Sequence, residues 1–379
     1  MPYDRVVTVR LEVGVGVDIV RATRRYESVL ARWMPLVPSD LAAKHRVMAE
    51  SPFHLLRGTF YRWAALWPAL AESERGAARV LGVGDLHVEN FGTWRDADGR
   101  MIWGINDFDE ATVLPWSADL ARLATSVVLA TEGGHLDVSL RRACAAILTG
   151  YAAGLAEGGR PFVLEERHAW LRRAATGELR DPVAFWQRMA GLPTARSLDP
   201  EARRLILAAL PPGSAPPRFA RRRAGVGSLG RPRFVGVADW RGGQVAREAK
   251  AMAPSAWAWA RGERAPAVRY AAIVSRAVRV PDPALEVHAS GGRGWLVRRL
   301  APHCTRIPLA DLPCRGDEEK LLAAMGFETA NVHLGSSGAR AVLRREIGRR
   351  KERWLRDLVG PLAQQVRSDH DAWRRQRFT

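Results

Sequence analysis

The chain has 379 residues, of which 47% are hydrophobic and 26% charged, so it can bury a large core and is globular rather than disordered. It has no apolar run long enough to cross a bilayer, no signal-peptide layout and only three scattered cysteines, so we expect a cytoplasmic protein without membrane contact or disulfide scaffold. The net charge of +18 is almost entirely arginine, because only four of 58 basic residues are lysine; it favours anionic ligands without choosing among them.

The first part of the chain is predicted to be helical. Helices are expected over 39–50 and from Pro52 to Trp67, the second with Ser51 as its cap. Arg57 lies among the apolar residues of the second helix. It is either a paired structural arginine, which is the default interpretation, or a residue that reaches a phosphate at an active site.

Residues 81–111 concentrate acidic and amide side chains between short apolar runs. The pattern predicts a buried strand that ends at Asp85, followed by a hairpin of strands 91–94 and 101–105. The hairpin turn is predicted at Asp98-Gly99, a dipeptide typical of tight β-turns.

A hairpin at this position brings three polar side chains together. Asn90 directly precedes its first strand and Asp107 follows its second, so both lie at the open end, near Asp85. Phosphoryl transfer needs a carboxylate that accepts the proton of the attacking hydroxyl, and oxygen ligands for Mg²⁺. Asp85 precedes Asn90 by five residues, as a kinase base precedes its metal-binding Asn, and Asp107 stands where a DFG motif supplies another ligand.

At these residues the chain resembles a known group of enzymes. GDLHVEN and INDFDEA are similar to the catalytic and metal-binding loops of aminoglycoside phosphotransferases and their kinase-like relatives. The resemblance implies that Asp119 opens a buried helix and braces the catalytic loop, and that His87 supports this loop. Asp109 replaces the glycine of a DFG motif, which adds a further candidate metal ligand.

The wider chain resembles a bacterial domain-of-unknown-function family (number 2252). The landmarks that carry this likeness are SPFHLLRG, GDLHVENFG, NDFDEA, GVGSLG and a final helical block. Between these landmarks, helices are predicted over 115–131, 138–155, 162–175 and 182–189. Residues 210–217, rich in proline, are predicted to be a linker.

A glycine-rich segment follows this linker. The candidate phosphate-binding residues there are Gly225, Gly227, Ser228 and Gly230. A dinucleotide-binding fingerprint runs into a helix, whereas this segment runs into a predicted strand, a turn and a second strand that ends at Lys250. Loop, strand, turn, strand and lysine is the order of a kinase phosphate-binding lobe, in which lysine holds the phosphates. The alternative is a plain glycine turn beside a solvated lysine.

A kinase-like lobe normally pairs its lysine with a helical glutamate. The helix predicted over 267–278 has none, which leaves Glu263 and Glu286 as candidates. A strand over 295–300 and a helix over 318–334 follow, the latter similar to the helix that precedes the catalytic loop in phosphotransferases. Helices over 339–359 and 361–375 close the chain.

These predictions define an α+β fold with two lobes, similar to protein kinases but circularly permuted, since the catalytic motifs precede the glycine-rich lobe. Residues 1–210 are predicted to form a helical catalytic lobe, 218–301 a β-rich nucleotide-binding lobe, and 302–379 helices that complete the catalytic lobe. Termini that lie close together tolerate such a permutation.

The leading functional hypothesis is a phosphotransferase that uses ATP and Mg²⁺, with an unidentified small hydroxylated molecule as acceptor. Asp85 is the predicted base, Asn90, Asp107 and Asp109 the metal ligands, and Lys250 a phosphate ligand.

One alternative is a metal-dependent phosphohydrolase that uses Asp85, His87, Glu89, Asp107 and Asp109. Another is an arginine-rich nucleic-acid-binding protein, which ranks last because no recognised binding motif is present.

Overall fold

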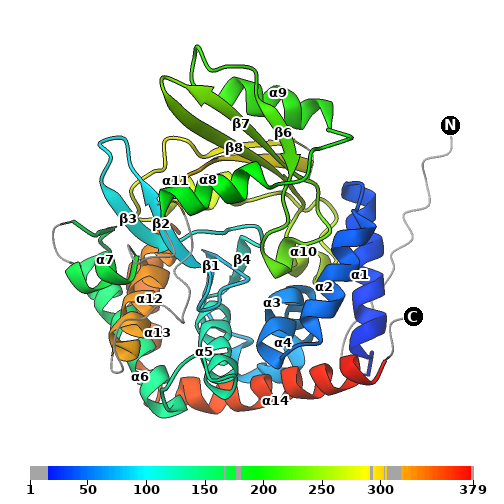
Figure 1. The fold of residues 1–379 in the computed structure, drawn as a ribbon. Coiled ribbons are helices and arrows are strands. Elements are labelled where there is room, and N and C mark those ends of the chain that lie inside the picture. The colour runs from blue at the N-terminus through cyan, green and yellow to red at the C-terminus, as the bar shows by residue number, and fades with distance from the viewer. Residues whose placement is uncertain are drawn as a thin grey trace.

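The computed structural model describes residues 16–165, 168–175, 181–290, 293–302, 304 and 317–376. A five-stranded antiparallel sheet lies over a larger helical body that also holds two small sheets (Figure 1). The expected α+β class is therefore confirmed. Within the described ranges, none of the helices combines the length and the apolar character that a membrane span requires.

The chain enters the helical body through four helices, α1 (Ile19–Trp33), α2 (Pro38–Met48), α3 (Pro52–Gly58) and α4 (Phe60–Leu70). Ser51 caps α3 by accepting a hydrogen bond from the His54 amide, as the Ser-Pro pair predicts. The single helix expected from Pro52 to Trp67 is wrong, because Thr59 leaves helical geometry (φ −132°, ψ 41°) and separates α3 from α4.

The predicted hairpin of residues 91–105 is confirmed. β2 (Phe91–Arg95) pairs antiparallel with β3 (Met101–Ile105), with Phe91 opposite Ile105. The preceding strand β1 (Arg79–Gly82) pairs with β4 (Thr112–Pro115). Residues 162–163 form a short strand, β5 (Phe162–Val163), on the edge of the hairpin, where a helix was expected; α7 (Ala169–Ala175) begins later.

The core of the helical body is built by α5 (Trp116–Glu132), α6 (Leu140–Glu157), α12 (Glu318–His333), α13 (Ala339–Gly348) and α14 (Trp354–Arg375). Glycines let α6 and α12 pack backbone against backbone. A Cβ atom on Gly150 would lie 1.8 Å from the Ala323 carbonyl oxygen, and one on Gly326 would lie 2.1 Å from that of Ile147. Helices this close share one hydrophobic core.

The C-terminal helices divide differently from the prediction. A helix break was expected at 360, but the break lies between Gly348 and Trp354, and Pro361 is inside α14. In Figure 1, α14 runs along the base of the helical body and ends on the same side as α1.

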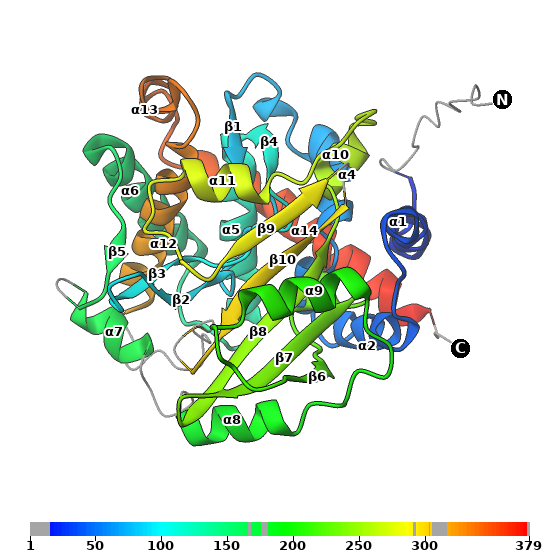
Figure 2. The same ribbon diagram turned by 90° about the horizontal axis from the view of Figure 1, so that it is seen from above.

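The large sheet consists of β6 (Arg218–Arg221), β7 (Arg233–Trp240), β8 (Gly243–Met252), β9 (Glu286–Ser290) and β10 (Arg293–Leu300). Its strand order is β6-β7-β8-β10-β9 (Figure 2). The two edge strands, β6 and β9, were not predicted, and β8 continues past Lys250. The short helices α10 (Ala256–Ala260) and α11 (Tyr270–Arg276) connect β8 to β9.

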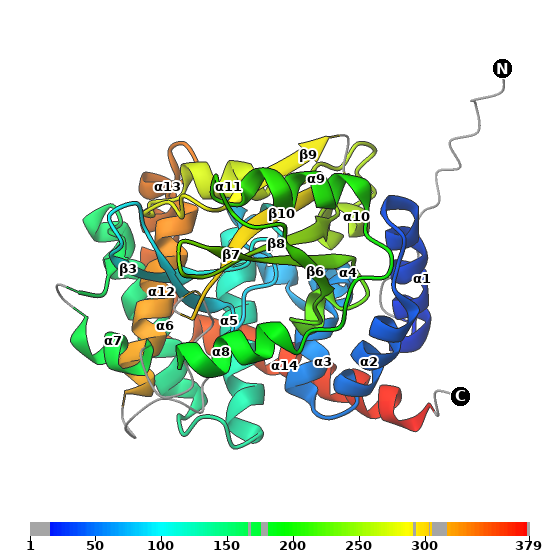
Figure 3. The ribbon, with the colours of Figure 1, turned by 45° about the horizontal axis from the view of Figure 1, so that its top comes forward.

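Helices cover both faces of this sheet (Figure 3). α9 (Pro200–Ala209) packs its apolar side on Phe234, Ala249 and Val297. α8 (Pro182–Ala190) packs Phe185 and Met189 on part of the opposite face. Both helices were expected in the catalytic lobe, but they pack on the sheet. Residues 210–217 therefore join α9 to β6 within one unit and do not connect two lobes.

The alternation of side chains along β8 determines which residues lie on the sheet face that α8 covers in part. Ala246 lies under α8, so Glu248 and Lys250, two and four residues further along β8, point to the same face. Beyond α8 this face is directed at the helical body. The sheet therefore presents charged side chains to the loops that follow β1 and β3.

Candidate functional site

The loop that carries Asp85 is held by a buried carboxylate. Asp119, in the first turn of α5, accepts hydrogen bonds from the amides of Val83 (2.7 Å) and Gly84 (2.8 Å). His333 on α12 contacts the same carboxylate at 3.0 Å through Nε2. Asp119 thus lies where the resemblance implied, against the backbone just before Asp85.

One oxygen of the Asp85 carboxylate is held by an arginine, and the other faces the glycine loop. Arg122, fully buried on α5, donates to Oδ1 from Nε (2.9 Å) and Nη2 (2.6 Å). Oδ2 faces the glycine loop, since a Cβ atom on Gly227 would lie 3.3 Å from it. Burial raises the pKa of Asp85, and Arg122 offsets this only in part.

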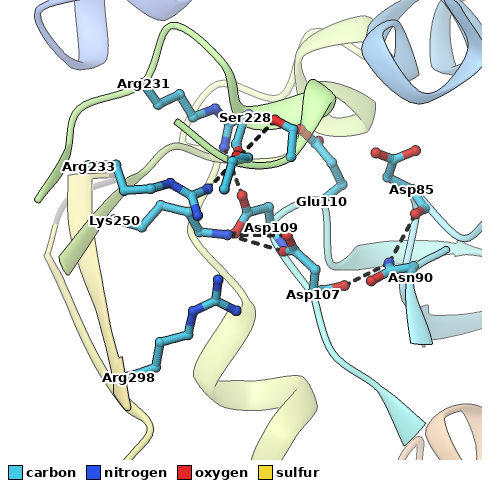
Figure 4. Close-up of polar contacts among 12 residues, drawn as sticks. Asp85, Asn90, Asp107, Asp109, Glu110, Ser228, Arg231, Arg233, Lys250 and Arg298 are labelled. Atoms are coloured by element: carbon cyan, nitrogen blue, oxygen red, sulfur yellow. Dashed lines mark hydrogen bonds and ion pairs between the residues drawn. The ribbon is translucent and has the colours of Figure 1, made fainter. Parts of the chain in front are cut away.

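Asn90 joins the loops of Asp85 and Asp107. Its Nδ2 donates to the backbone carbonyl of Asp85 at 3.1 Å and to that of Asp107 at 3.0 Å (Figure 4). Both amide hydrogens are thereby used in positioning the two loops. The side-chain oxygen Oδ1 is an acceptor, the atom type that binds magnesium.

Lys250 reaches from β8 to two carboxylates of the helical body. Its Nζ lies 3.3 Å from Asp107 and 2.6 Å from Asp109. Burial, and then the charge of Asp107, raise the pKa of Asp109. Neither candidate glutamate occupies this position, and Glu286 is instead paired with His288 on β9. The expected lysine–glutamate pair is therefore replaced by a lysine–aspartate pair.

A second buried carboxylate lies next to Asp109. Glu110 accepts hydrogen bonds from Arg231 (3.1 Å) and from the amide of Ala256 (2.6 Å). Burial nevertheless raises the pKa of Glu110 to about 7. Lys44, buried in the same cavity, has its pKa lowered to about 8, mainly because burial disfavours the charged amine.

The glycine loop closes over the loop that carries Asp85. Three of its predicted residues, Gly225, Gly227 and Ser228, line the same cavity as Asp85, whereas Gly230 lies against Leu41 of α2. Positive φ angles of 73° at Gly225 and 95° at Gly230 favour glycine. A Cβ on Gly227 would lie 3.1 Å from the Arg57 carbonyl oxygen. The Ser228 hydroxyl accepts a hydrogen bond from Arg233 at 2.7 Å, which fixes the loop to the sheet.

Arg57 and His87 line the same cavity as Asp85. Arg57 is ion-paired with Glu89 at 2.6 Å. The Nδ1 atom of His87 accepts a hydrogen bond from the Glu89 amide at 3.2 Å. Both residues therefore stabilise the loop between Asp85 and Asn90.

Every acidic residue of the alternative hydrolase site is paired with a cation. Arg122 pairs with Asp85, Arg57 with Glu89, and Lys250 with both Asp107 and Asp109. In the described part of the chain, no group of three or more Asp, Glu, His or Cys side chains is arranged to hold a metal ion. These ion pairs lend the hydrolase alternative little support.

Several charged residues of the site were missed in the sequence. Arg122 lies three residues after Asp119 on a predicted helix, and Glu248 lies two residues before Lys250 on a predicted strand, so periodicity was an available signal for both. Arg231 and Arg298 had no local signal, because their positions depend on how the sheet docks on the helical body and how its strands pair.

The chain matches the family described as uncharacterized protein conserved in bacteria (DUF2252) over residues 36–182 and 218–376. It belongs to that family. The matched segments contain the loops of Asp85 and Asp107, the glycine loop and Lys250. No curated protein and no solved structure matches the chain.

Proposed function

We propose that this member of the family is an ATP- and Mg²⁺-dependent phosphotransferase with a small hydroxylated acceptor. The observation that carries the proposal is the convergence, in one cavity, of Asp85, Asn90 and Asp107 with the glycine loop. Lys250 reaches Asp107 from the sheet. A proton acceptor, oxygen ligands and phosphate-binding backbone are the parts that phosphoryl transfer requires.

The layout of the sheet supports a kinase-like lobe. The glycine loop lies between β6 and β7, and Lys250 lies on β8, the third strand in chain order. A protein-kinase lobe has a glycine-rich loop over the phosphates and its lysine on the third strand. This agreement covers strand order and residue position, whereas the aspartate partners of Lys250 are a departure.

A circular permutation explains the order of the elements. α12 lies beside β1, and the Leu81 amide on β1 donates to the Ser336 hydroxyl just after α12, at 2.8 Å. In the unpermuted order such a helix would lead directly into the catalytic strand. We therefore place the cut between α12 and β1, with α13, α14 and α1–α4 as the elements that flank it.

Asp85 performs the proton transfer in this proposal. The acceptor hydroxyl oxygen forms a bond to the γ-phosphorus, its proton moves to Oδ2 of Asp85, and the bond to the β-phosphate oxygen breaks to release ADP. Arg122 holds Oδ1 and so orients the other oxygen toward the cavity. The raised pKa of Asp85 makes it a better proton acceptor than an exposed aspartate.

The donor set fits magnesium at two of the three predicted ligands. Asp107 offers a carboxylate whose side chain is 29% exposed, and Asn90 offers its amide oxygen. Asp109 fits less well, because its oxygens face Lys250 at 2.6 Å and Arg231 at 3.6 Å. When bound, the metal would neutralise charge on the β- and γ-phosphates.

Calorimetric titration with ATP, with and without Mg²⁺, tests the proposal. Wild type is compared with Lys250→Met and Asp107→Asn, which keep side-chain size, and with Lys320→Met as a surface control. We expect Lys250→Met to lose at least tenfold in affinity, Asp107→Asn to lose the Mg²⁺ dependence, and Lys320→Met to bind like wild type. Thermal unfolding of each variant verifies that it is folded.

Two results would overturn the proposal. One is the absence of specific ATP binding by the wild type. The other is a folded Lys250→Met protein that binds ATP with wild-type affinity and Mg²⁺ dependence.

A further inference from the structure

Three arginines surround one buried glutamate on the sheet face that is directed at the site. Glu248, fully buried on β8, pairs with Arg222 at 2.6 Å, Arg233 at 3.1 Å and Arg298 at 2.9 Å. Arg298 lies directly opposite Glu248 in the pairing of β10 with β8. The glutamate therefore fixes three guanidinium groups from three different parts of the sheet.

These arginines form one wall of a cavity. The opposite wall belongs to the catalytic and metal-binding loops. The cavity is lined by Arg222, Arg233 and Arg298 on one side and by Asn90, Asn106 and Asp107 on the other, with Gly225 between them. In Figure 4, Arg298 and Arg233 extend from the sheet toward the side on which Asp107 lies.

The charges within the cluster do not cancel. Three guanidinium groups face one carboxylate, which leaves a local surplus of two positive charges. Asp107, on the opposite wall, shares Lys250 with Asp109, so these three groups together carry one negative charge. The groups around the cavity therefore keep a net surplus of one positive charge. Partly buried positive charge without a counter-ion is costly, so the cavity favours an anion.

We propose that Arg222, Arg233 and Arg298 form an anion subsite that takes a polyphosphate chain. Guanidinium groups bind phosphate oxygens through two parallel hydrogen bonds, and a fixed Glu248 presents them without loss of side-chain freedom on binding. Identification of this anion as the phosphate tail of ATP rests on the phosphotransferase proposed above, whereas the anion subsite itself does not.

The three arginines have different parts in the subsite. Arg233 is 5% exposed and already donates to Ser228, so it ties the glycine loop to the cluster. Arg222 and Arg298 are 25% and 19% exposed, respectively, and border the cavity. These two provide the direct phosphate contacts, and Glu248 is a positioning residue.

Inorganic tripolyphosphate is the probe that tests the subsite without a nucleoside. The full chain is titrated by calorimetry with tripolyphosphate, ATP and adenosine, at low and moderate salt. Arg222→Gln and Arg298→Gln are each expected to weaken tripolyphosphate binding at least tenfold. Arg204→Gln, an exposed arginine paired with Glu201, is the control and leaves binding unchanged.

The outcomes separate this inference from the proposed function. Arginine-dependent binding of tripolyphosphate without any binding of ATP supports the subsite and removes the phosphotransferase. Binding of ATP that depends on Lys250 but not on Arg222 or Arg298 overturns the subsite alone.

If a glutamine variant does not fold, Arg222→Lys and Arg298→Lys replace it in the test. Lysine keeps the positive charge but lacks the paired N–H donors of the guanidinium group. The two lysine variants are expected to lose part of the affinity, and wild-type affinity in both would overturn the proposal.

Discussion

Two buried glutamates on opposite sides of the site have opposite electrostatic surroundings. Burial alone would raise the pKa of Glu248 on the sheet, but Arg233, Arg222 and Arg298 hold it well below its ordinary value. Burial raises the pKa of Glu110, next to Asp109, to about 7, and Arg231 does not compensate. The sheet side thus has an excess of cations over its carboxylate, and the loop side has carboxylates that are incompletely neutralised.

This difference indicates what each side lacks. The sheet side needs a negative partner, and the loop side gains stability from a proton or a cation. A magnesium-bound polyphosphate placed between them would satisfy both sides at once. Variants that remove each charge separately test this contrast.

Glu248→Gln should have the largest effect. The change leaves Arg222, Arg233 and Arg298 without their shared carboxylate, and breaking a buried ion pair costs about 3–5 kcal/mol. Urea denaturation at pH 7 measures this loss in the free energy of unfolding. Glu201→Gln, which removes an exposed pair with Arg204, is the control and should keep the wild-type midpoint. Equal midpoints for both variants would contradict the assigned role of Glu248.

Glu110→Gln should have an effect that depends on pH. Since the folded-state pKa is raised from 4.5 to about 7, the folded protein binds more protons than the unfolded one between these values. Ionisation of Glu110 therefore lowers wild-type stability as pH rises from about 4.5 to about 7. Glutamine does not titrate, so the variant should gain up to about 3 kcal/mol relative to wild type across this window.

Urea denaturation of both proteins at pH 5 and pH 8 measures this change. Other titrating groups cancel in the difference between wild type and variant. A difference that is the same at both pH values would show that Glu110 has an ordinary pKa.

Gly227→Ala should have the smallest effect. Its new methyl group would lie 3.1 Å from the Arg57 carbonyl oxygen and 3.3 Å from Asp85, so the loop must shift by a few tenths of an ångström. We expect the ATP dissociation constant to rise by less than about tenfold, or about 1.4 kcal/mol. Gly243→Ala, which has open space around it, is the control. If calorimetry gives the same ATP dissociation constant for the two variants, the glycine loop does not contact the nucleotide.

Local patterns were sufficient for the loop side of the site. The Asp98-Gly99 turn predicted the hairpin, and the hairpin placed Asn90 and Asp107 together without any long-range information. The order of glycine loop, strand and Lys250 likewise predicted three neighbouring parts of the sheet. Within each of these two groups the residues lie within about 30 positions of each other in the chain. At such separations strand period and turn chemistry decide the geometry.

The sheet side could not be predicted in the same way. Arg298 meets Glu248 because β10, rather than β9, pairs with β8, and arginine-rich strands give no signal for that choice. The apolar faces of α8 and α9 were recognisable, but a hydrophobic face does not specify which surface it packs against. Thr59 is not a typical helix breaker, so the break between α3 and α4 also had no signal.

Contacts between the N-terminal and C-terminal segments of the chain hold the helical body together. Arg62 binds Asp369 at 2.9 Å, Glu74 binds Arg350 at 2.8 Å, and β1 lies beside α12. During synthesis the segments of the sheet and its two covering helices are made before α12 and α14. Contacts between such distant segments form slowly because long loops must close first. We therefore expect the contact of His333 on α12 with Asp119, behind the Asp85 loop, to be among the last to form.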